Sequence, residues 1–223
     1  NHLLVAVNNG CDFFEMSGKE GLLRRGGIRL PKAVTFIAPG LISTAEGIYP
    51  INESFLRGPP SLTVSSRLPH QTTRLAATNT DLAYVFTQQS ELSRINIIVN
   101  SPNNVVASAF LDPPAASSSF SISTNFAFVT TGGLLNAFDI TAADRISNAT
   151  QLQISATRVL VAHPEHPTPM IIAGPNGIGE YSLTGGGTAP ILTLQAMYTQ
   201  AGETGASLAF DENQTSYAMH TDG

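Results

Sequence analysis

The amino-acid sequence predicts an all-β protein made of four-stranded antiparallel blades, the architecture of a β-propeller. Three observations lead to this prediction. Only 12% of the residues are charged, about half the usual share, and Ser, Thr, Asn, Gly and Pro are abundant, which is typical of short strands joined by turns. No segment has the 3.6-residue apolar period of an amphipathic helix. A pattern of two strands and a turn recurs along the chain at a regular interval.

The recurring pattern is an apolar strand, a turn that usually contains glycine, and a second alternating strand, as in residues 126–140 and 170–183. Glycine suits these turns because a two-residue hairpin needs positive φ angles. The last turn residue marks each copy, and successive markers lie 37, 42, 44, 44 and 46 residues apart. A pitch of about 43 residues is in the range of a four-stranded propeller blade. The markers are Gly10, Gly47, Gln89, Gly133, Gly177 and Gly223.

The remaining strands of each repeat are expected before and after the marked pair. Short runs rich in small residues precede it and suit the innermost strand, where crowding near a central channel favours Ala and Ser. These inner runs are residues 33–38, 74–77, 119–123, 158–162 and 206–210, and the expected outer strands are 105–111, 151–155 and 190–198. The repeat units are about 1–32, 33–73, 74–118, 119–157, 158–205 and a partial unit 206–223.

The whole chain, residues 1–223, is thus predicted to be one β-propeller domain with about five visible repeats, or a fragment of a six- or seven-bladed ring. A β-sandwich is the alternative, since Gly and Asn mark turns there as well. The regular longer pitch favours the propeller, because sandwich strands recur at 8–12 residues without a fixed two-strand repeat.

Two of the repeats resemble the YVTN-type repeat of bacterial and archaeal surface propellers and, more loosely, the lactonase-like propellers. The resemblance rests on residues 83–86 (AYVF) with 95–96 and 105–106, and on residues 126–130 (FAFVT) with 138–140 (FDI). It implies a toroidal protein of exterior or periplasmic type with loops at both faces. Lactonase-like relatives would place catalytic residues around the central channel. The sequence has no matching set, so no catalytic residue is carried over.

Composition limits the function classes. The net charge is −5 and the eleven basic residues are scattered, whereas nucleic-acid affinity needs clustered Lys and Arg. Nucleic-acid binding is therefore not expected. The adjacent pair Arg24-Arg25 is expected in a solvated turn. No run approaches the roughly 20 apolar residues that span a bilayer. We therefore expect a non-catalytic extracellular or cell-surface module, structural or binding, without a cofactor. The alternative is a lactonase-like hydrolase with a metal in the central channel.

The candidate site residues are few. His163, Glu165 and His166 could ligate a metal, but the flanking prolines keep the backbone extended and point the two imidazoles to different sides. We therefore expect an exposed loop there and predict no metal site. The run Ser117-Ser118-Ser119 is expected to link two blades. Three N-x-Ser/Thr sequons, at Asn52, Asn148 and Asn213, are candidates for glycosylation.

Protein–protein contact is the predicted mode of action, in a homo-oligomer or a filament. In a ring of five repeats the last strand would be surplus, and an unpaired edge is a template for a strand of another chain. Residues 3–7 are a second candidate for this exchange, and simple truncation of a longer propeller is an equal alternative. The candidates for self-association are Ser216, Tyr217, Ala218, Met219, His220 and Thr221.

Overall fold

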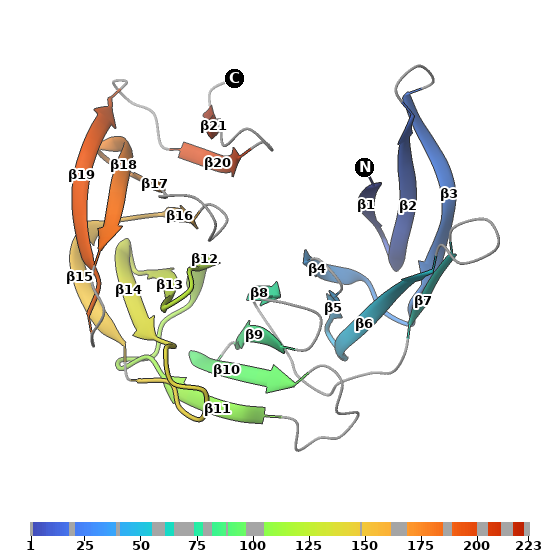
Figure 1. Cartoon of the computed structure of the whole chain (residues 1–223), viewed down its shortest axis with the longest axis horizontal. Helices are drawn as coiled ribbons and strands as arrows, with labels where there is room; N and C mark the ends of the chain where they lie inside the picture. Colours follow the sequence, from blue (N-terminus) through green and yellow to red (C-terminus); the bar gives the residue numbers. More distant parts are fainter. Residues whose placement is uncertain are drawn as a thin grey trace. The chain divides into compact units, whose positions relative to one another are not determined.

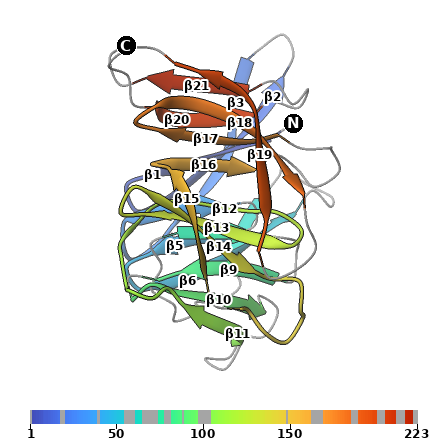
Figure 2. The same ribbon diagram turned by 90° about the vertical axis from the view of Figure 1, so that its left-hand side faces the viewer.

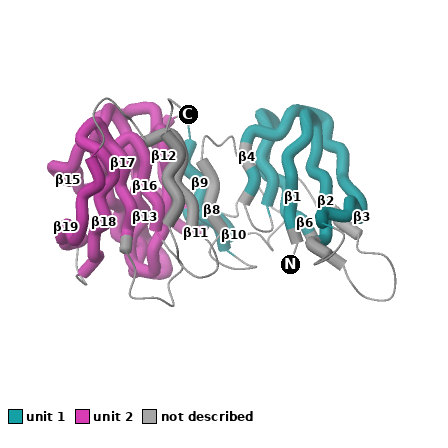
Figure 3. Tube along the Cα trace, turned by 90° about the horizontal axis from the view of Figure 1, so that it is seen from above, with its two compact units in different colours: residues 1–88, 94–105 teal, residues 89–93, 106–223 magenta. Residues whose placement is uncertain are grey.

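The computed structural model of the chain is all-β, which confirms the predicted fold class at that level (Figure 1). Its described residues form 21 strands and no helix, so no described segment is a helix that could cross a membrane. The chain divides into two compact units, Asn1–Gln88 with Arg94–Val105 and Gln89–Ser93 with Val106–Gly223 (Figure 3). The structure describes residues 2–17, 21–38, 41–54, 61–64, 74–77, 82–87, 89–96, 105–147, 149–161, 169–184, 189–199, 205–210 and 216–220.

The first unit begins with a three-stranded antiparallel sheet followed by a four-stranded one, each ordered as in the sequence. Successive side chains of the first strand point to opposite faces of the first sheet. Leu4 packs into a core cluster, whereas Leu3 and Val5 are exposed on the other face. Cys11 and Ile42 join the two sheets in that cluster. The strands are β1 (His2–Val7), β2 (Gly10–Ser17), β3 (Gly21–Arg29), β4 (Val34–Ala38), β5 (Leu41–Thr44), β6 (Gly47–Ser54) and β7 (Ser61–Val64).

A third sheet has the strand order β11-β10-β9-β8, again a meander of consecutive strands. Its two central strands are largely buried, and the boundary between the two units passes through β10. The strands are β8 (Arg74–Ala77), β9 (Leu82–Phe86), β10 (Glu91–Asn96) and β11 (Val105–Phe110).

The second unit contains two more four-stranded meanders and a two-stranded sheet. The first meander is β12 (Ser117–Ile122), β13 (Phe126–Thr131), β14 (Leu134–Asp139) and β15 (Thr150–Ser155). The second meander, which also faces the viewer in Figure 2, consists of β16 (Arg158–Val161), β17 (Pro169–Gly174), β18 (Gly177–Thr184) and β19 (Ile191–Tyr198). The last sheet pairs β20 (Gly205–Phe210) with β21 (Ser216–His220).

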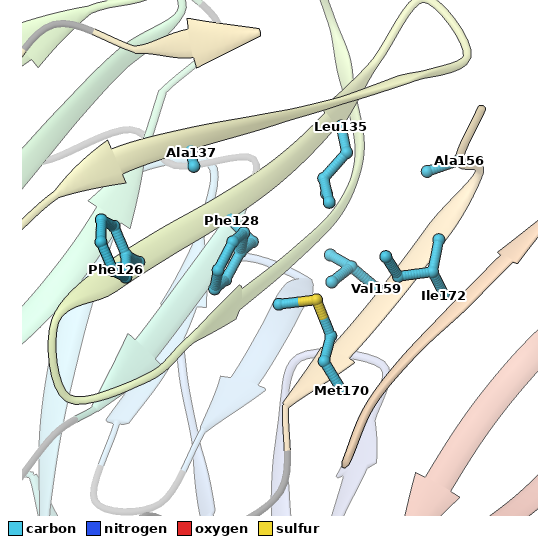
Figure 4. Close-up of a cluster of buried hydrophobic side chains, with 8 residues drawn as sticks. All are labelled: Phe126, Phe128, Leu135, Ala137, Ala156, Val159, Met170 and Ile172. Atoms are coloured by element: carbon cyan, nitrogen blue, oxygen red, sulfur yellow. The ribbon is translucent and has the colours of Figure 1, made fainter. Parts of the chain in front are cut away.

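The two meanders enclose the main core of this unit between their facing surfaces. Phe128 and Leu135 from one sheet meet Met170 and Ile172 from the other, and all four are at most 3% exposed (Figure 4). The inner strands β12 and β16 also lie together, as do β16 and β20. The first strands of these three sheets are thus successive neighbours, and the last strands β15 and β19 are half exposed and mostly exposed, respectively.

Serine side chains of β12 form hydrogen bonds with the backbone of β16 and of Thr157, which precedes it. The backbone N–H of Val159 donates to Ser119 Oγ at 3.1 Å, and that of Val161 donates to Ser121 Oγ at 2.9 Å. Ser118 Oγ donates to the carbonyl of Thr157 at 2.9 Å. The serine run predicted as a linker is therefore part of a strand. That prediction was wrong because serine serves here as a hydrogen-bond partner of a neighbouring sheet and not as a flexible spacer.

The predicted turn at Arg24-Arg25 was also wrong, because both residues lie within β3. The glycine turns are partly confirmed. Gly47, Gly133 and Gly177 have positive φ angles of 149°, 82° and 112°, as hairpin turns require. In the repeat that lacks a turn glycine, Ser90 takes this conformation with φ 62°.

We expect Gly177→Ala to lower the free energy of unfolding by about 2 kcal/mol. Its φ of 112° disfavours any side chain, and a Cβ atom would collide with the carbonyl oxygen of Tyr198. Gly132→Ala is the matched control, since Gly132 has a φ of 57° and open space around the added methyl group. That variant should cost about 1 kcal/mol, the penalty for a left-handed residue. Urea titrations measure the free energy of unfolding of both variants. Equal losses in the two variants would contradict the predicted collision at Gly177.

Candidate functional site

The residues predicted from sequence are only partly placed. His163, Glu165 and His166, with Asn148, Asn213 and Thr221, lie outside the described residues. Within the described part of the chain no three His, Cys, Asp or Glu side chains gather as metal ligands would. Asn52 lies in β6 opposite Thr63 of β7. Residues 216–220 form β21, which pairs with β20.

An exposed ion-pair network lies across β2 and β3. Arg24 Nη2 and Arg29 Nη1 each donate to Asp12 Oδ1 at 3.0 Å, and Arg25 Nε donates to Glu15 Oε2 at 2.7 Å. Asp12 stands opposite Gly27, where a Cβ atom would collide with the carboxylate. Glycine at that position therefore gives the carboxylate room to lie between two guanidinium groups.

The hydrogen bond from Arg24 holds the pKa of Asp12 below its ordinary 3.8, with Arg29 adding to the effect and partial burial opposing it. The same contact raises the pKa of Arg24. A carboxylate so stabilised in its charged form is a poor proton acceptor at neutral pH. This network therefore fastens the β2–β3 hairpin and is not a candidate acid–base site.

The stabilisation from Asp12 should disappear in acid. Because its pKa is lower in the folded state, its contribution is complete above the unfolded pKa and is lost as the pH falls through the folded pKa. We expect wild type to melt above Asp12→Asn at pH 6, and the difference to vanish as the pH falls from 3.8 through the depressed value. Thermal melts of both proteins between pH 2 and pH 7 measure this, and a constant difference in Tm would contradict it.

A buried arginine is the most unusual polar group of the first unit. Arg94 in β10 is 4% exposed, and its Nε donates to the hydroxyl oxygen of Tyr84 in β9 at 2.7 Å. Its guanidinium carbon lies 5.2 Å from the centre of the Tyr84 ring, within range of a cation–π interaction. Burial raises the pKa of Tyr84, and the hydrogen bond and charge of Arg94 partly oppose this. Tyr84 therefore stays protonated and neutral at physiological pH.

A hollow of about 390 Å³ opens in the second unit at the end of β11. Its lining is about equally polar and apolar, with Asp112 as the one carboxylate among its lining residues and a Phe110 side chain that is 55% exposed. A carboxylate beside a phenyl face can attract a small organic cation. The other lining residues are Leu111, Pro114 and Ala149.

The outer strand β19 exposes several large apolar side chains. Ile191 is 61% exposed and Tyr198 58%, with Leu194 at 47% and Met197 at 41%. The predicted outer strand 190–198 included these residues, but the sequence pattern did not identify them as an exposed surface. Large apolar side chains that gather on a surface mark a contact with another protein more often than a catalytic site.

Comparisons with known proteins give the fold without a function. No family model matches the sequence, and no curated protein matches it. Among solved structures 222 chains match. One is a functionally unknown protein from Desulfotomaculum acetoxidans DSM 771, with a TM-score of 0.64 and 11% sequence identity over 89% of this chain and 67% of that chain. At this identity the likeness concerns the fold alone.

Proposed function

We propose that the chain is a β-propeller, whole or in part, and that it is a non-catalytic extracellular module that associates with copies of itself. Four four-stranded meanders of consecutive strands support the propeller, as does the contact of β16 with both β12 and β20, the first strands of the sheets before and after it. The low charge content, the three sequons and the likeness to YVTN-type repeats support an exterior location.

The observation that carries the function is the exposed apolar surface of β19. Four large apolar side chains there are between 41% and 61% exposed. Several exposed large apolar side chains on one outer strand favour a contact with another protein chain. Of the predicted modes of action, protein–protein contact explains this surface and hydrolysis of a small substrate does not.

Sedimentation velocity over a wide concentration range tests the proposed self-association, with metal analysis of the same sample. We expect the weight-average sedimentation coefficient to rise with concentration. A protein that stays monomeric throughout would overturn the self-association. A stoichiometric, tightly bound Ca²⁺ or Zn²⁺ would overturn the purely structural role and favour the lactonase-like hydrolase.

Small-angle X-ray scattering tests the propeller separately. A propeller scatters as one flat, compact particle, and that is the expected profile of the monomer at low concentration. Two units that move independently would give a longer maximum dimension and would contradict a closed arrangement.

A further inference from the structure

The strand β19 has the properties of an open edge. It is the last strand in the order β16-β17-β18-β19, and it is eight residues long. It contains no proline, and no charged residue occurs between Tyr181 and Gly202. Edge strands normally carry charges, prolines or short lengths that prevent pairing with another chain. β19 has none of these three protections, although it contains a β-bulge, a fourth feature that disfavours edge pairing.

Two other outer strands, β15 and β3, expose polar or charged side chains where β19 exposes apolar ones. In β15 the exposed side chains are polar, at Gln151, Gln153 and Ser155. In β3 the exposed Arg24 and Arg25 form ion pairs with Asp12 and Glu15, so charged groups lie on this outer strand. The outer strand β11, by contrast, exposes Val105 on one face and Val106 and Phe110 on the other, and it contains no charge and no proline. β19 thus shares its apolar, uncharged character with β11 and differs from it in length, with eight residues against six.

A β-bulge gives β19 an unusual distribution of side chains. Its register against β18 shifts between Glu180 and Tyr181, so Gln195 is an extra residue without a partner there. The Gln195 side chain fastens the bulge by donating to Ser182 Oγ at 2.9 Å and to the Thr193 carbonyl at 3.2 Å. Alternation is interrupted at this point.

The interruption places both ends of β19 on the same face. Ile191 pairs with Thr184 and Tyr198 with Ile178, and both partners lie on one face of β18. Leu192 and Met197, opposite Leu183 and Gly179, lie together on the other face. In a regular strand, residues 191 and 198 would lie on opposite faces. The exposed edge is thus apolar on both of its faces.

This distribution makes the strand complementary to itself. In an antiparallel pair, directly opposite residues share a face. A twofold axis between Leu194 and Gln195 sets Ile191 against Tyr198 of the second copy and Leu192 against Met197. Thr193 meets Ala196 on the same face as Ile191. All three pairs match only because of the bulge, and no like charges meet. If only one face of β19 were apolar, the paired strands would make apolar contacts on that face alone.

We infer that β19 pairs with β19 of a second copy, antiparallel and about this twofold axis, so that the two outer strands join two sheets into one. The interface is isologous and closes as a dimer. This inference rests on the proposed self-association and names its surface, which is β19 and not the β21 segment expected from sequence.

The test exploits the pairing of position 191 with position 198 across the axis. In the I191K/Y198K variant, the lysine at position 191 of each copy faces the lysine at position 198 of the other copy, so both pairs carry like charges. In I191K/Y198E both pairs carry opposite charges. Both side chains are more than half exposed in the monomer, so the fold should tolerate the changes. Gln153→Lys on the outer strand β15 is the control for adding a charge to an exposed edge. Circular dichroism and thermal melts verify folding.

Sedimentation equilibrium measures the dimer dissociation constant of each protein. We expect I191K/Y198K to raise it about tenfold or more, I191K/Y198E to recover most of the loss in low salt but not in high salt, and Q153K to leave it unchanged. Unchanged dimerisation of I191K/Y198K would overturn the inference while the proposed self-association stands, and deletion of residues 212–223 would then test β21. Equal losses in both double variants would overturn the twofold register. A monomeric wild type would remove the proposed self-association itself.

Discussion

Phe128→Ala should lower the free energy of unfolding by about 4 kcal/mol, the largest effect expected for a single substitution in this chain. The Phe128 ring is fully buried between the two meanders of the second unit, beside Phe126 at a centroid distance of 6.1 Å. Its removal loses apolar burial and leaves a cavity that side chains from both sheets line. Neither sheet can close the cavity alone, because the backbone ladders of β13 and β17 hold them in place.

Phe110→Ala is the matched control for this substitution. Phe110 lies in β11 of the same unit, and its side chain is 55% exposed. The substitution removes the same atoms as Phe128→Ala. We expect a loss below about 1 kcal/mol, as for a surface position. Urea denaturation followed by circular dichroism gives both values. Similar losses at the two positions would show that the packing between the two sheets is not the main stabilising contact there.

Arg94→Ala should cost about 3 kcal/mol, the second largest effect. The substitution removes the buried aliphatic stem and the cation–π contact with Tyr84. It also leaves the buried Tyr84 hydroxyl without the donor at 2.7 Å. A buried polar group that loses its partner carries a desolvation penalty of about 1–3 kcal/mol.

A double-mutant cycle isolates this pair. Tyr84→Phe alone should cost about 2 kcal/mol, because the buried guanidinium loses the acceptor for its Nε–H. The double variant Tyr84→Phe/Arg94→Ala should then cost clearly less than the two single losses added together. Tyr198→Phe, at a hydroxyl on an exposed ring, is the control and should change little. Strict additivity in the cycle would mean that the two side chains do not stabilise each other.

The strands themselves could be predicted from sequence because their signals are local. The inner run 74–77 and the outer run 105–111 correspond to β8 and β11, with a difference of at most one residue. Alternation and turn chemistry act over a few residues, so a single sequence displays them. The same is true of Gly133 and Gly177, whose positive φ angles the hairpin turns require.

The errors have long-range causes. Residues 24–27 (RRGG) resemble a turn, yet they belong to β3 because Arg24 binds Asp12 and Gly27 gives that carboxylate room. These partners are 12 to 17 residues apart in sequence, and no local pattern relates them. The serines of β12 find their partners in β16 at a separation of 40 residues.

The candidate interface was missed for a related reason. Ile191 and Tyr198 could be assigned to an outer strand, but their common face depends on the bulge at Gln195, which appears only in the pairing of β18 with β19. The pair Tyr84–Arg94 is similar, since a single arginine in an alternating strand is normally at the surface. The propeller ring and the non-catalytic role stay predictions.

The serine hydroxyls of β12 also bear on how the second unit folds. Val159 and Val161 use N–H groups on the open side of β16, so that strand is held partly by the sheet that precedes it in the chain. The sheet β12–β15 thereby supports the sheet that follows it, as neighbouring units do in a linear array with nearest-neighbour coupling. We therefore expect the sheet β12–β15 to fold before the sheet β16–β19. A destabilising substitution in the earlier sheet should make the unfolding of the later sheet less cooperative.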